Sequence, residues 1–171
     1  HYLDAFGGAE RREYDSLQYL VGRTLHEVMP AALADGFLAD VRRVIETLAD
    51  SGSFLELQRI FGRGIITGFI RLEGRPVALI ANDCQQLGGA VDSQSAEKAA
   101  RFLRICDALQ LPVLSLTDTP GFMVGPDSER QGAVRSMSAL FLAGAGMTVP
   151  VVAIFLRKGY GLGAMAMTGG S

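Results

Sequence analysis

Histidine, cysteine and tryptophan are scarce in this sequence of 171 residues, which has two histidines, two cysteines and no tryptophan. His1 and His26 both precede the glycine-rich part of the chain, so the sequence does not favour catalysis by a histidine base. Cys84 and Cys106 lie in apolar segments without the spacing of a metal site, and we expect reduced thiols in the core, as in a cytosolic protein. The sequence therefore predicts no metal centre.

Excess charge and long apolar runs are also missing. Sixteen basic and 18 acidic residues give a net charge of −2, which does not favour nucleic-acid binding. No apolar run reaches the roughly 18 residues of a membrane span, and no signal-peptide pattern opens the sequence. The G-x-S-x-G elbow and the G-x-x-x-x-G-K-S/T phosphate loop are absent. The apolar fraction of 49% fits one globular domain or part of one.

Hydrophobic periodicity predicts an α/β fold with crossover connections. Gly52 is expected to stop the first helix, Glu73-Gly74-Arg75 to turn a β-hairpin, and Ser93 or Ser95 to cap the second helix. Because the strands are apolar throughout, we expect both faces of the sheet to be covered. The predicted order is a helix with an apolar stripe from 37 to 48, strands at 64–72 and 76–82, a helix within 92–111, a strand at 112–118, a helix at 128–146, and a strand, a glycine-rich turn and a helix start within 149–167.

Three glycine-bearing loops each follow a predicted strand and precede a predicted helix. They contain Gly88-Gly89, Gly121 with Gly125, and Gly159 with Gly161 and Gly163. Such loops meet at the carboxyl ends of parallel strands, where ligands bind. Glycine lets the backbone approach a ligand closely, and paired backbone amides suit a developing oxyanion such as a thioester enolate. The alternative is that these glycines only form tight turns.

A dinucleotide site is a weaker interpretation of the third loop. The run "GYGLGA" (159–164) fits G-x-G-x-x-A, but the acidic residue expected about 20 positions later would fall beyond the sequence. Among the side chains near these loops, Asp118 is either catalytic or a turn cap, and Asp92 either lines a pocket or caps the helix after it. Arg157-Lys158 either meets an anion or forms a solvated strand end.

Three stretches of the sequence carry a family resemblance. They are "SGSFLELQ" (51–58), "SAEKAARFLRICDALQLPVLSLTDTPGFMVG" (95–125) and "MTVPVVAIFLRKGYGLGAMAM" (147–167). The chain resembles the C-terminal half of the carboxyltransferase (β) subunit of biotin-dependent acyl-CoA carboxylases, the acetyl-CoA and propionyl-CoA carboxylase type. The resemblance covers 37–171 as a carboxyltransferase domain truncated at its C-terminal end, whereas 1–36 is a poorly matched N-terminal segment. Since the sequence begins at His1 and stops near a predicted helix, we expect a fragment of a longer polypeptide.

The resemblance implies a fold and a reaction. The fold would be a crotonase-like (ClpP/crotonase) ββα superhelix, here a partial domain. The reaction would move a carboxyl group from N1′ of carboxybiotin to the α-carbon of a short acyl-CoA, acetyl-CoA or propionyl-CoA. Two oxyanion holes would do most of the work, and the released biotin anion would take the α-proton, so no histidine is required. No metal is implied in this domain.

The resemblance also implies site residues. The biotin-side oxyanion hole would be made by backbone amides, and three residues near it would bind substrate. The amides are those of Gly88, Gly89, Gly121, Phe122, Met123 and Val124, and the substrate-binding residues are Asp92, Tyr160 and Gly161.

The implied partners are a biotin carboxyl carrier protein, a biotin carboxylase subunit and further copies of the chain, as a dimer building block or a hexamer. The location would be the cytoplasm, or the mitochondrial matrix in a eukaryote, and the fragment would be inactive alone. In the helix at 128–146, apolar residues on more than one face are either interface or core: Val134, Met137, Leu140, Phe141 and Leu142.

Three motifs differ from the sequences that are usual in the family. The chain has "NDC" (82–84) for "NQP", "LGGAVD" (87–92) for "AGCLD", and "RKGYGLGA" (157–164) for "RKAYGGAY". The acyl chain therefore stays open. Two alternatives also stay open, a biotin-dependent acyl-CoA decarboxylase subunit of the same fold and a non-catalytic assembly domain.

Overall fold

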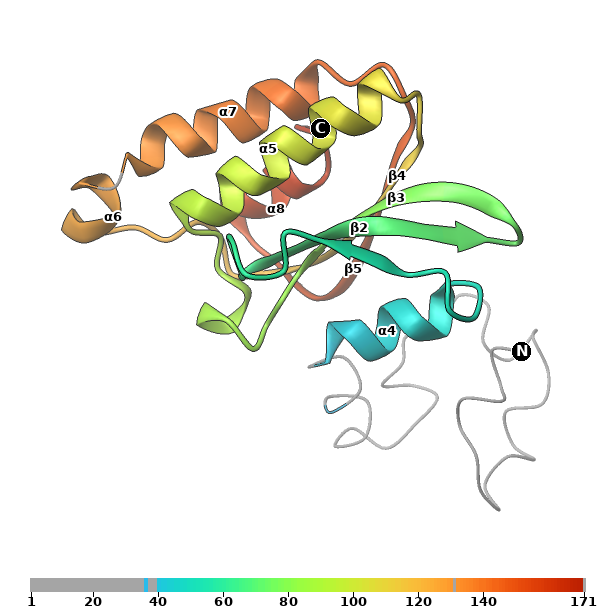
Figure 1. Cartoon of the computed structure of the whole chain (residues 1–171). Coiled ribbons are helices and arrows are strands. Elements are labelled where there is room, and N and C mark those ends of the chain that lie inside the picture. Colours follow the sequence, from blue (N-terminus) through green and yellow to red (C-terminus); the bar gives the residue numbers. More distant parts are fainter. Residues whose placement is uncertain (1–35, 37–39, 131, 171) are drawn as a thin grey trace.

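The computed structural model describes residues 36, 40–130 and 132–170, which form one mixed sheet with helices on both faces (Figure 1). His1, His26 and most of the segment 1–36 lie outside the described residues, as do Phe37 and Leu38 of the predicted helical stripe. The elements are α4 (Val41–Leu48), β1 (Leu55–Leu57), β2 (Ile65–Leu72), β3 (Arg75–Asn82), the 3₁₀ turn η3 (Leu87–Gly89), α5 (Ser93–Ala108), β4 (Val113–Thr119), α6 (Pro126–Arg130), α7 (Ala133–Ala145), β5 (Val151–Gly159) and α8 (Gly161–Met167).

The sheet has the strand order β1-β2-β3-β4-β5. The first two pairings are antiparallel and the last two, β3–β4 and β4–β5, are parallel. The predicted hairpin and the α/β crossovers are therefore confirmed. Because β3, β4 and β5 run in the same direction, the loops that follow them lie at one edge of the sheet.

The β2–β3 hairpin closes with a two-residue loop, one residue shorter than expected. Leu72 pairs with Arg75, and Glu73 and Gly74 both have positive φ, which fits the twist of a tight hairpin turn. The Asp50 carboxylate accepts hydrogen bonds from the backbone N–H of Glu73 at 3.0 Å and of Gly74 at 2.7 Å. A residue that follows α4 thus holds the turn of the hairpin.

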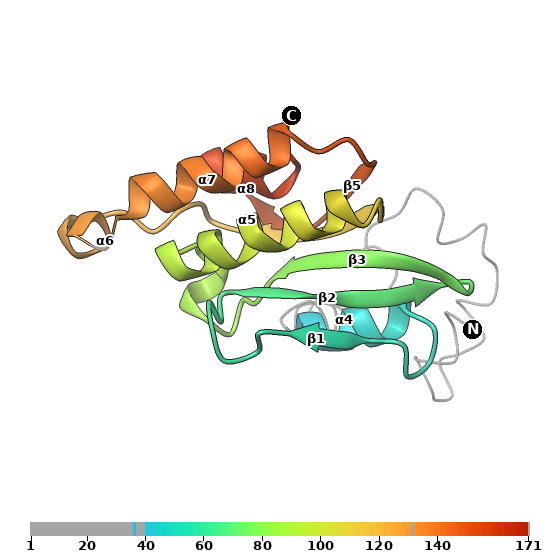
Figure 2. The same cartoon turned by 45° about the horizontal axis from the view of Figure 1, so that its top comes forward.

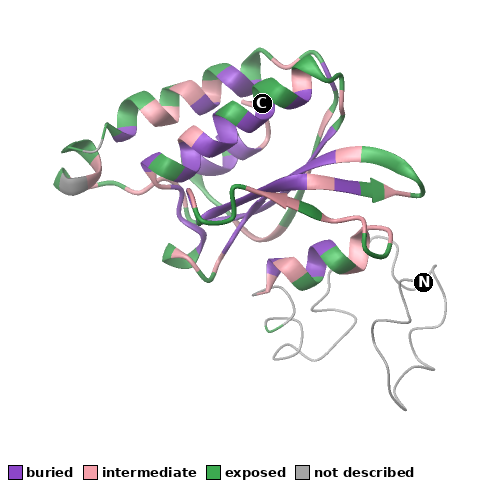
Figure 3. Cartoon of the chain, in the orientation of Figure 1, coloured by how far each residue is buried: buried purple, intermediate pink, exposed green. Residues whose placement is uncertain are grey.

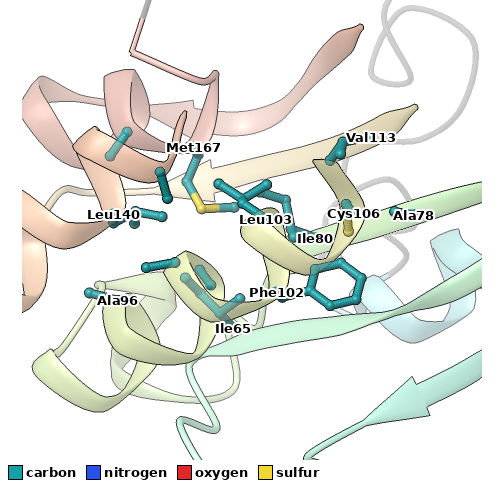
Figure 4. Close-up of a cluster of buried hydrophobic side chains, with 14 of the residues drawn as sticks. Ile65, Ala78, Ile80, Ala96, Phe102, Leu103, Cys106, Val113, Leu140 and Met167 are labelled. Atoms are coloured by element: carbon teal, nitrogen blue, oxygen red, sulfur yellow. The ribbon is translucent and has the colours of Figure 1, made fainter. Parts of the chain in front are cut away.

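Apolar side chains form a core on each face of the sheet. Helices α5 and α7 cover one face and α4 covers the other (Figures 1 and 2). Phe102 of α5 packs against Phe69 of β2 with ring centroids 5.4 Å apart, and Cys106 is buried nearby, as predicted. Figure 4 shows part of this larger cluster, which includes Ile65, Ala78, Ile80, Ala96, Leu103, Val113, Leu140 and Met167. The smaller cluster under α4 includes Val41, Ile45, Ile66, Ile70, Leu79, Leu114 and Leu116.

Two predicted helix features are wrong. The helix expected at 128–146 is two helices, because Gly132 between α6 and α7 adopts φ +75° and interrupts the helical path. Helix α5 is capped by Asp92, whose carboxylate accepts a hydrogen bond from the Ser95 N–H at 2.8 Å, and not by Ser93 or Ser95. A carboxylate at this position also interacts favourably with the positive end of the helix dipole.

The expectation that every strand is covered on both faces is wrong for β5. Val152, Ile154 and Phe155 are exposed in this edge strand, whereas β4 is buried along its whole length (Figure 3). Of the apolar residues weighed as core or interface in α7, Leu140 is core, and Val134 and Leu142 are exposed. Met137 and Phe141 are half-buried.

Candidate functional site

The three glycine-bearing loops meet at the carboxyl edge of β3, β4 and β5. The loop after β3 and the loop after β4 are joined by two hydrogen bonds. The Val91 N–H donates to the Gly121 carbonyl at 3.0 Å, and the Met123 N–H donates to the Val91 carbonyl at 2.9 Å. The loop after β5 joins them where the Tyr160 N–H donates to the Thr119 carbonyl at 3.2 Å. Segments expected to cooperate in one site are thus brought together.

Close backbone packing explains two of the glycines. Gly89 has φ +90°, and a Cβ there would collide with the carbonyl oxygen of Asp118. A Cβ on Gly163 in α8 would lie 2.7 Å from the Cα of Gly121 and 3.0 Å from the amide nitrogen of Phe122. The loop after β3 therefore lies against the end of β4, and α8 lies against the loop after β4.

A buried polar network lies beneath these loops and is centred on Asp118, which is fully buried at the end of β4. Its carboxylate accepts hydrogen bonds from the Arg157 side chain at 2.7 Å and from the Lys158 backbone N–H at 3.2 Å. Burial is the largest single influence on Arg157 and would lower its pKa, but the hydrogen bonds and charge interactions with Asp118 and Cys84 together outweigh it, so the pKa is raised. Asp118 therefore acts as an acceptor that ties β4 to β5, which supports neither a catalytic role nor the predicted turn cap.

Asn82 completes this network from the end of β3. Its side-chain oxygen accepts a hydrogen bond from the Asp118 N–H at 3.0 Å, and its side-chain amide donates to the Gly89 carbonyl at 3.5 Å. The Lys158 ammonium donates to the carbonyl of Gly88 at 2.7 Å. No sequence motif indicated a role for Asn82, although this residue stands first in the "NDC" triplet that replaces the family's "NQP".

Cys84 is half-buried beside the same network, and not fully in the core as expected. Its thiol donates a hydrogen bond to the Asp118 carbonyl at 3.3 Å. Burial and the neighbouring Asp118 raise the pKa of this thiol to about 11. Cys84 therefore stays protonated near neutral pH and is not activated as a nucleophile.

Three of the six amides assigned to the biotin-side oxyanion hole are already engaged within the chain. The Gly89 N–H donates to the Gln86 carbonyl at 2.9 Å, and the Gly121 N–H donates to the Thr119 hydroxyl at 3.1 Å. The Met123 N–H donates to the Val91 carbonyl. The expectation that all six are free donors is therefore corrected. The amides of Gly88, Phe122 and Val124 stay as the predicted donors.

The three residues assigned to substrate binding have different surroundings. The Asp92 carboxylate caps α5, which is the structural alternative weighed for it. Tyr160 and Gly161 are exposed at the start of α8, where Tyr160 is the N-cap residue. Contact of all three with substrate stays a prediction.

A second charged cluster, which the sequence analysis did not predict, joins α4 to the start of the loop after β3. Arg42 donates to Asp83 at 2.6 Å and to Glu56 at 3.0 Å. Lys98 of α5 is fully buried, and its ammonium donates to the Ile65 carbonyl at 2.7 Å. Burial lowers the pKa of Lys98 to about 8. These residues are far apart in the sequence, so no local motif indicated the cluster.

Residues 36, 40–130 and 132–170 hold no group of three or more His, Cys, Asp and Glu side chains placed to bind a metal ion. Within the same ranges no helix has the length and apolar character needed to cross a membrane.

Comparisons with known families, curated proteins and solved structures all match carboxyl transferase or acyl-CoA carboxylase proteins. The carboxyl transferase domain family matches residues 10–171. The propionyl-CoA carboxylase beta chain of Roseobacter denitrificans is 47% identical over 122 residues, which are 71% of this chain and 24% of that protein. The chain thus spans about a quarter of the length of this curated relative.

Solved structures agree with the sequence relatives. A single-chain, multi-domain long-chain acyl-CoA carboxylase superposes with a TM-score of 0.76 and 57% identity, over 77% of this chain and 14% of that one. The transcarboxylase 12S hexamer core, solved with methylmalonyl-CoA, superposes with a TM-score of 0.73 and 36% identity, over 75% of this chain and 25% of that one. The crotonase-like fold expected from the resemblance is confirmed, here as a partial domain.

Proposed function

The chain belongs to the carboxyl transferase domain family, and we propose that it forms the biotin-side part of a site that transfers a carboxyl group from carboxybiotin to the α-carbon of an acyl-CoA. One observation carries the proposal. Three glycine-bearing loops converge at the carboxyl edge of the parallel strands and are held together by backbone hydrogen bonds. Such a site presents backbone donors to an anion without a side-chain acid or base.

The donor set fits the ureido group of carboxybiotin. The predicted donors at Gly88, Phe122 and Val124 lie in the two loops that the Val91 hydrogen bonds join. The nearby carboxylate, that of Asp118, is buried and paired with Arg157, so its charge is compensated beneath the site. A preorganised amide costs little reorganisation when negative charge develops on the ureido oxygen. Carboxybiotin would supply the carboxyl group, and the amides of this chain would stabilise the negative charge left when that group departs.

The acceptor is an acyl-CoA, and two chain lengths are candidates. The propionyl-CoA carboxylase beta chain of Roseobacter denitrificans supports a short acyl-CoA, whereas the long-chain acyl-CoA carboxylase has the higher identity, 57% against 47%. The long-chain candidate therefore stands beside the acetyl-CoA and propionyl-CoA predicted from the sequence. Biotin would arrive on a carrier domain that a biotin carboxylase loads, on separate subunits or on one polypeptide. We infer a homo-oligomer in the cytoplasm, with the full site in a longer protein.

The proposal is tested on the full-length protein that contains this sequence. We would incubate it with free biocytin and one of malonyl-CoA, methylmalonyl-CoA or a long-chain 2-carboxyacyl-CoA, and follow loss of the carboxyl group from the thioester. Biocytin-dependent loss establishes carboxyl transfer, and the fastest ester identifies the acceptor. A folded protein that decarboxylates none of the three esters would contradict the proposal and favour a non-catalytic assembly domain. Loss coupled to sodium transport would favour the decarboxylase subunit.

A further inference from the structure

One side chain connects the end of β5 to the exposed loop after β3. The Lys158 ammonium donates a 2.7 Å hydrogen bond to the carbonyl of Gly88, which is 70 positions away in the sequence. Its target is a backbone carbonyl of the predicted oxyanion loop, and not a carboxylate. A hydrogen bond from a charged donor is stronger than one between neutral groups.

The loop that receives this bond needs support from outside. Leu87 and Gly88 are exposed, and they have φ +50° and φ +61°. The left-handed conformation of Leu87 is unfavourable for a residue with a side chain, so it persists where surrounding contacts enforce it. Within the loop, short-range turn bonds offset part of this cost, and they run from Gln86 to Asp83, from Gly89 to Gln86 and from Ala90 to Leu87.

Lys158 is itself held in place. Its backbone N–H donates to Asp118 at 3.2 Å, and the neighbouring Arg157 donates to the other oxygen of that carboxylate at 2.7 Å. The Asp118 N–H in turn donates to Asn82, which precedes the loop. Asp118 and Asn82 are fully buried, so the base from which the Lys158 side chain extends is rigid.

We propose that Lys158 is a positioning residue, which anchors the Gly88 carbonyl and so fixes the loop after β3 in the conformation that presents the Gly88 amide as a donor. The proposal rests on the proposed function for its catalytic consequence, but the anchoring itself does not. Phe122 and Val124 lie in the loop after β4, which the backbone bonds with Val91 hold, so loss of the anchor loosens the Gly88 donor and leaves the other two predicted donors in place. The effect should therefore fall on turnover with biocytin rather than on folding.

The test compares Lys158→Met, which keeps the alkyl stem but removes the donor, with Lys158→Arg, which keeps a charged donor. Arg75→Met is the matched control, because it also removes one positive charge. Arg75 is the first residue of β3, so it lies at the other end of that strand from the loop that Lys158 contacts. In the full-length protein, we expect Lys158→Met to lower kcat for biocytin-dependent decarboxylation about tenfold or more. The KM for the acyl-CoA and the thermal midpoint should stay unchanged, and Lys158→Arg should restore most of kcat.

A second measurement does not depend on activity. Hydrogen–deuterium exchange of the segment 84–92 should be faster in Lys158→Met than in wild type or in Arg75→Met, because the Gly89 and Ala90 amides lose their fixed turn geometry. Unchanged exchange in this segment, or a kcat within twofold of wild type, would overturn the proposal. An inactive wild-type protein would refute the proposed function instead, and the exchange measurement would still decide the anchoring.

Discussion

At the scale of single residues, the site depends on positions where no side chain fits. Gly89 combines a positive φ with close contact to the Asp118 carbonyl, so its lack of a side chain serves two purposes. Lys158 and Asn82 reach the same loop from two different strands. The loop that carries the predicted Gly88 donor is therefore held by side chains from outside that loop.

Gly89→Ala should disrupt the fold around the site. The added methyl group meets the Asp118 carbonyl and forces a left-handed alanine, and we expect a loss of about 3 kcal/mol in the free energy of unfolding. Gly52→Ala is the control, because Gly52 has φ +68° with open space around its Cβ, and it should cost only about 1 kcal/mol. Denaturant unfolding measures both variants. Equal losses would show that the contact with Asp118 does not matter.

Lys98 should make stability depend on pH in the alkaline range. Burial lowers its pKa from 10.5 to about 8, so the folded chain binds fewer protons than the unfolded chain between these values, and stability rises with pH there. The raised thiol pKa values of Cys84, about 11, and Cys106, about 12, act in the opposite direction above pH 9. A comparison of wild type with Lys98→Met removes the contribution of the thiols to the pH dependence, since both proteins contain them.

The unfolding free energy of wild type relative to Lys98→Met should therefore increase from pH 8 to pH 10.5. The variant also loses the hydrogen bond from Lys98 to the Ile65 carbonyl. This loss shifts the difference in unfolding free energy at every pH, because the amine can donate in both protonation states, and it does not reverse the trend. A difference that stays flat across the range would mean that Lys98 is as readily protonated in the fold as in the unfolded chain.

At the scale of elements, short polar contacts fix how helices and strands begin and turn. Asp92 starts α5, and Asp50 holds the turn between β2 and β3. Both carboxylates accept backbone N–H groups that the regular element leaves without a partner. The hairpin carries β3, and β3 leads directly into the loop that Lys158 anchors, so the turn bears on the site through one strand.

Replacement of Asp50 by alanine should weaken the hairpin. The variant leaves the backbone N–H groups of Glu73 and Gly74 to water, and we expect a loss of about 1–2 kcal/mol in the free energy of unfolding. Asp50→Asn keeps one acceptor oxygen and should lose about half as much. Chemical denaturation monitored by far-UV circular dichroism compares the three proteins. An alanine variant as stable as wild type would show that water replaces the carboxylate without cost.

The elements that could be predicted from the sequence are those with a local signal. The continuous apolar runs of β2 and β3 and the amphipathic pattern of α5 each extend over many residues, and the structure contains all three elements. The three-residue strand β1 is too short to show a period. The break between α6 and α7 depends on one glycine, and helical patterns commonly tolerate an isolated glycine.

The convergence of the three loops could be predicted from the sequence, but the engagement of their amides could not. Glycines placed after strands indicated which loops would meet, because parallel strands end at the same edge. Which amides are engaged depends on pairs such as Met123 with Val91, and these pairs form only when the loops are packed together. The bond from Lys158 to Gly88 spans 70 positions, so no spacing rule could indicate it.

At the scale of the whole molecule, the face of the sheet beneath α4 is covered at β4 but not at the edge strand β5. Leu114 and Leu116 of β4 are buried beneath α4, whereas their partners across the strand pair, Val152 and Ile154, are 58% and 41% exposed. These two residues continue the apolar face beyond the edge of the α4 layer. A long apolar edge strand is a template for association with another chain.

The 171-residue chain produced by itself should therefore self-associate through β5. Sedimentation velocity should show assemblies that grow with protein concentration, and the double variant Val152→Lys with Ile154→Lys should shift the protein toward the monomer, because charged edge residues oppose strand pairing. Leu55→Lys is the matched control. Leu55 is 59% exposed in β1 at the other edge, but that strand has three residues and offers little length for pairing. A chain that stays monomeric, or association that Leu55→Lys suppresses equally, would show that β5 is not the surface that drives assembly.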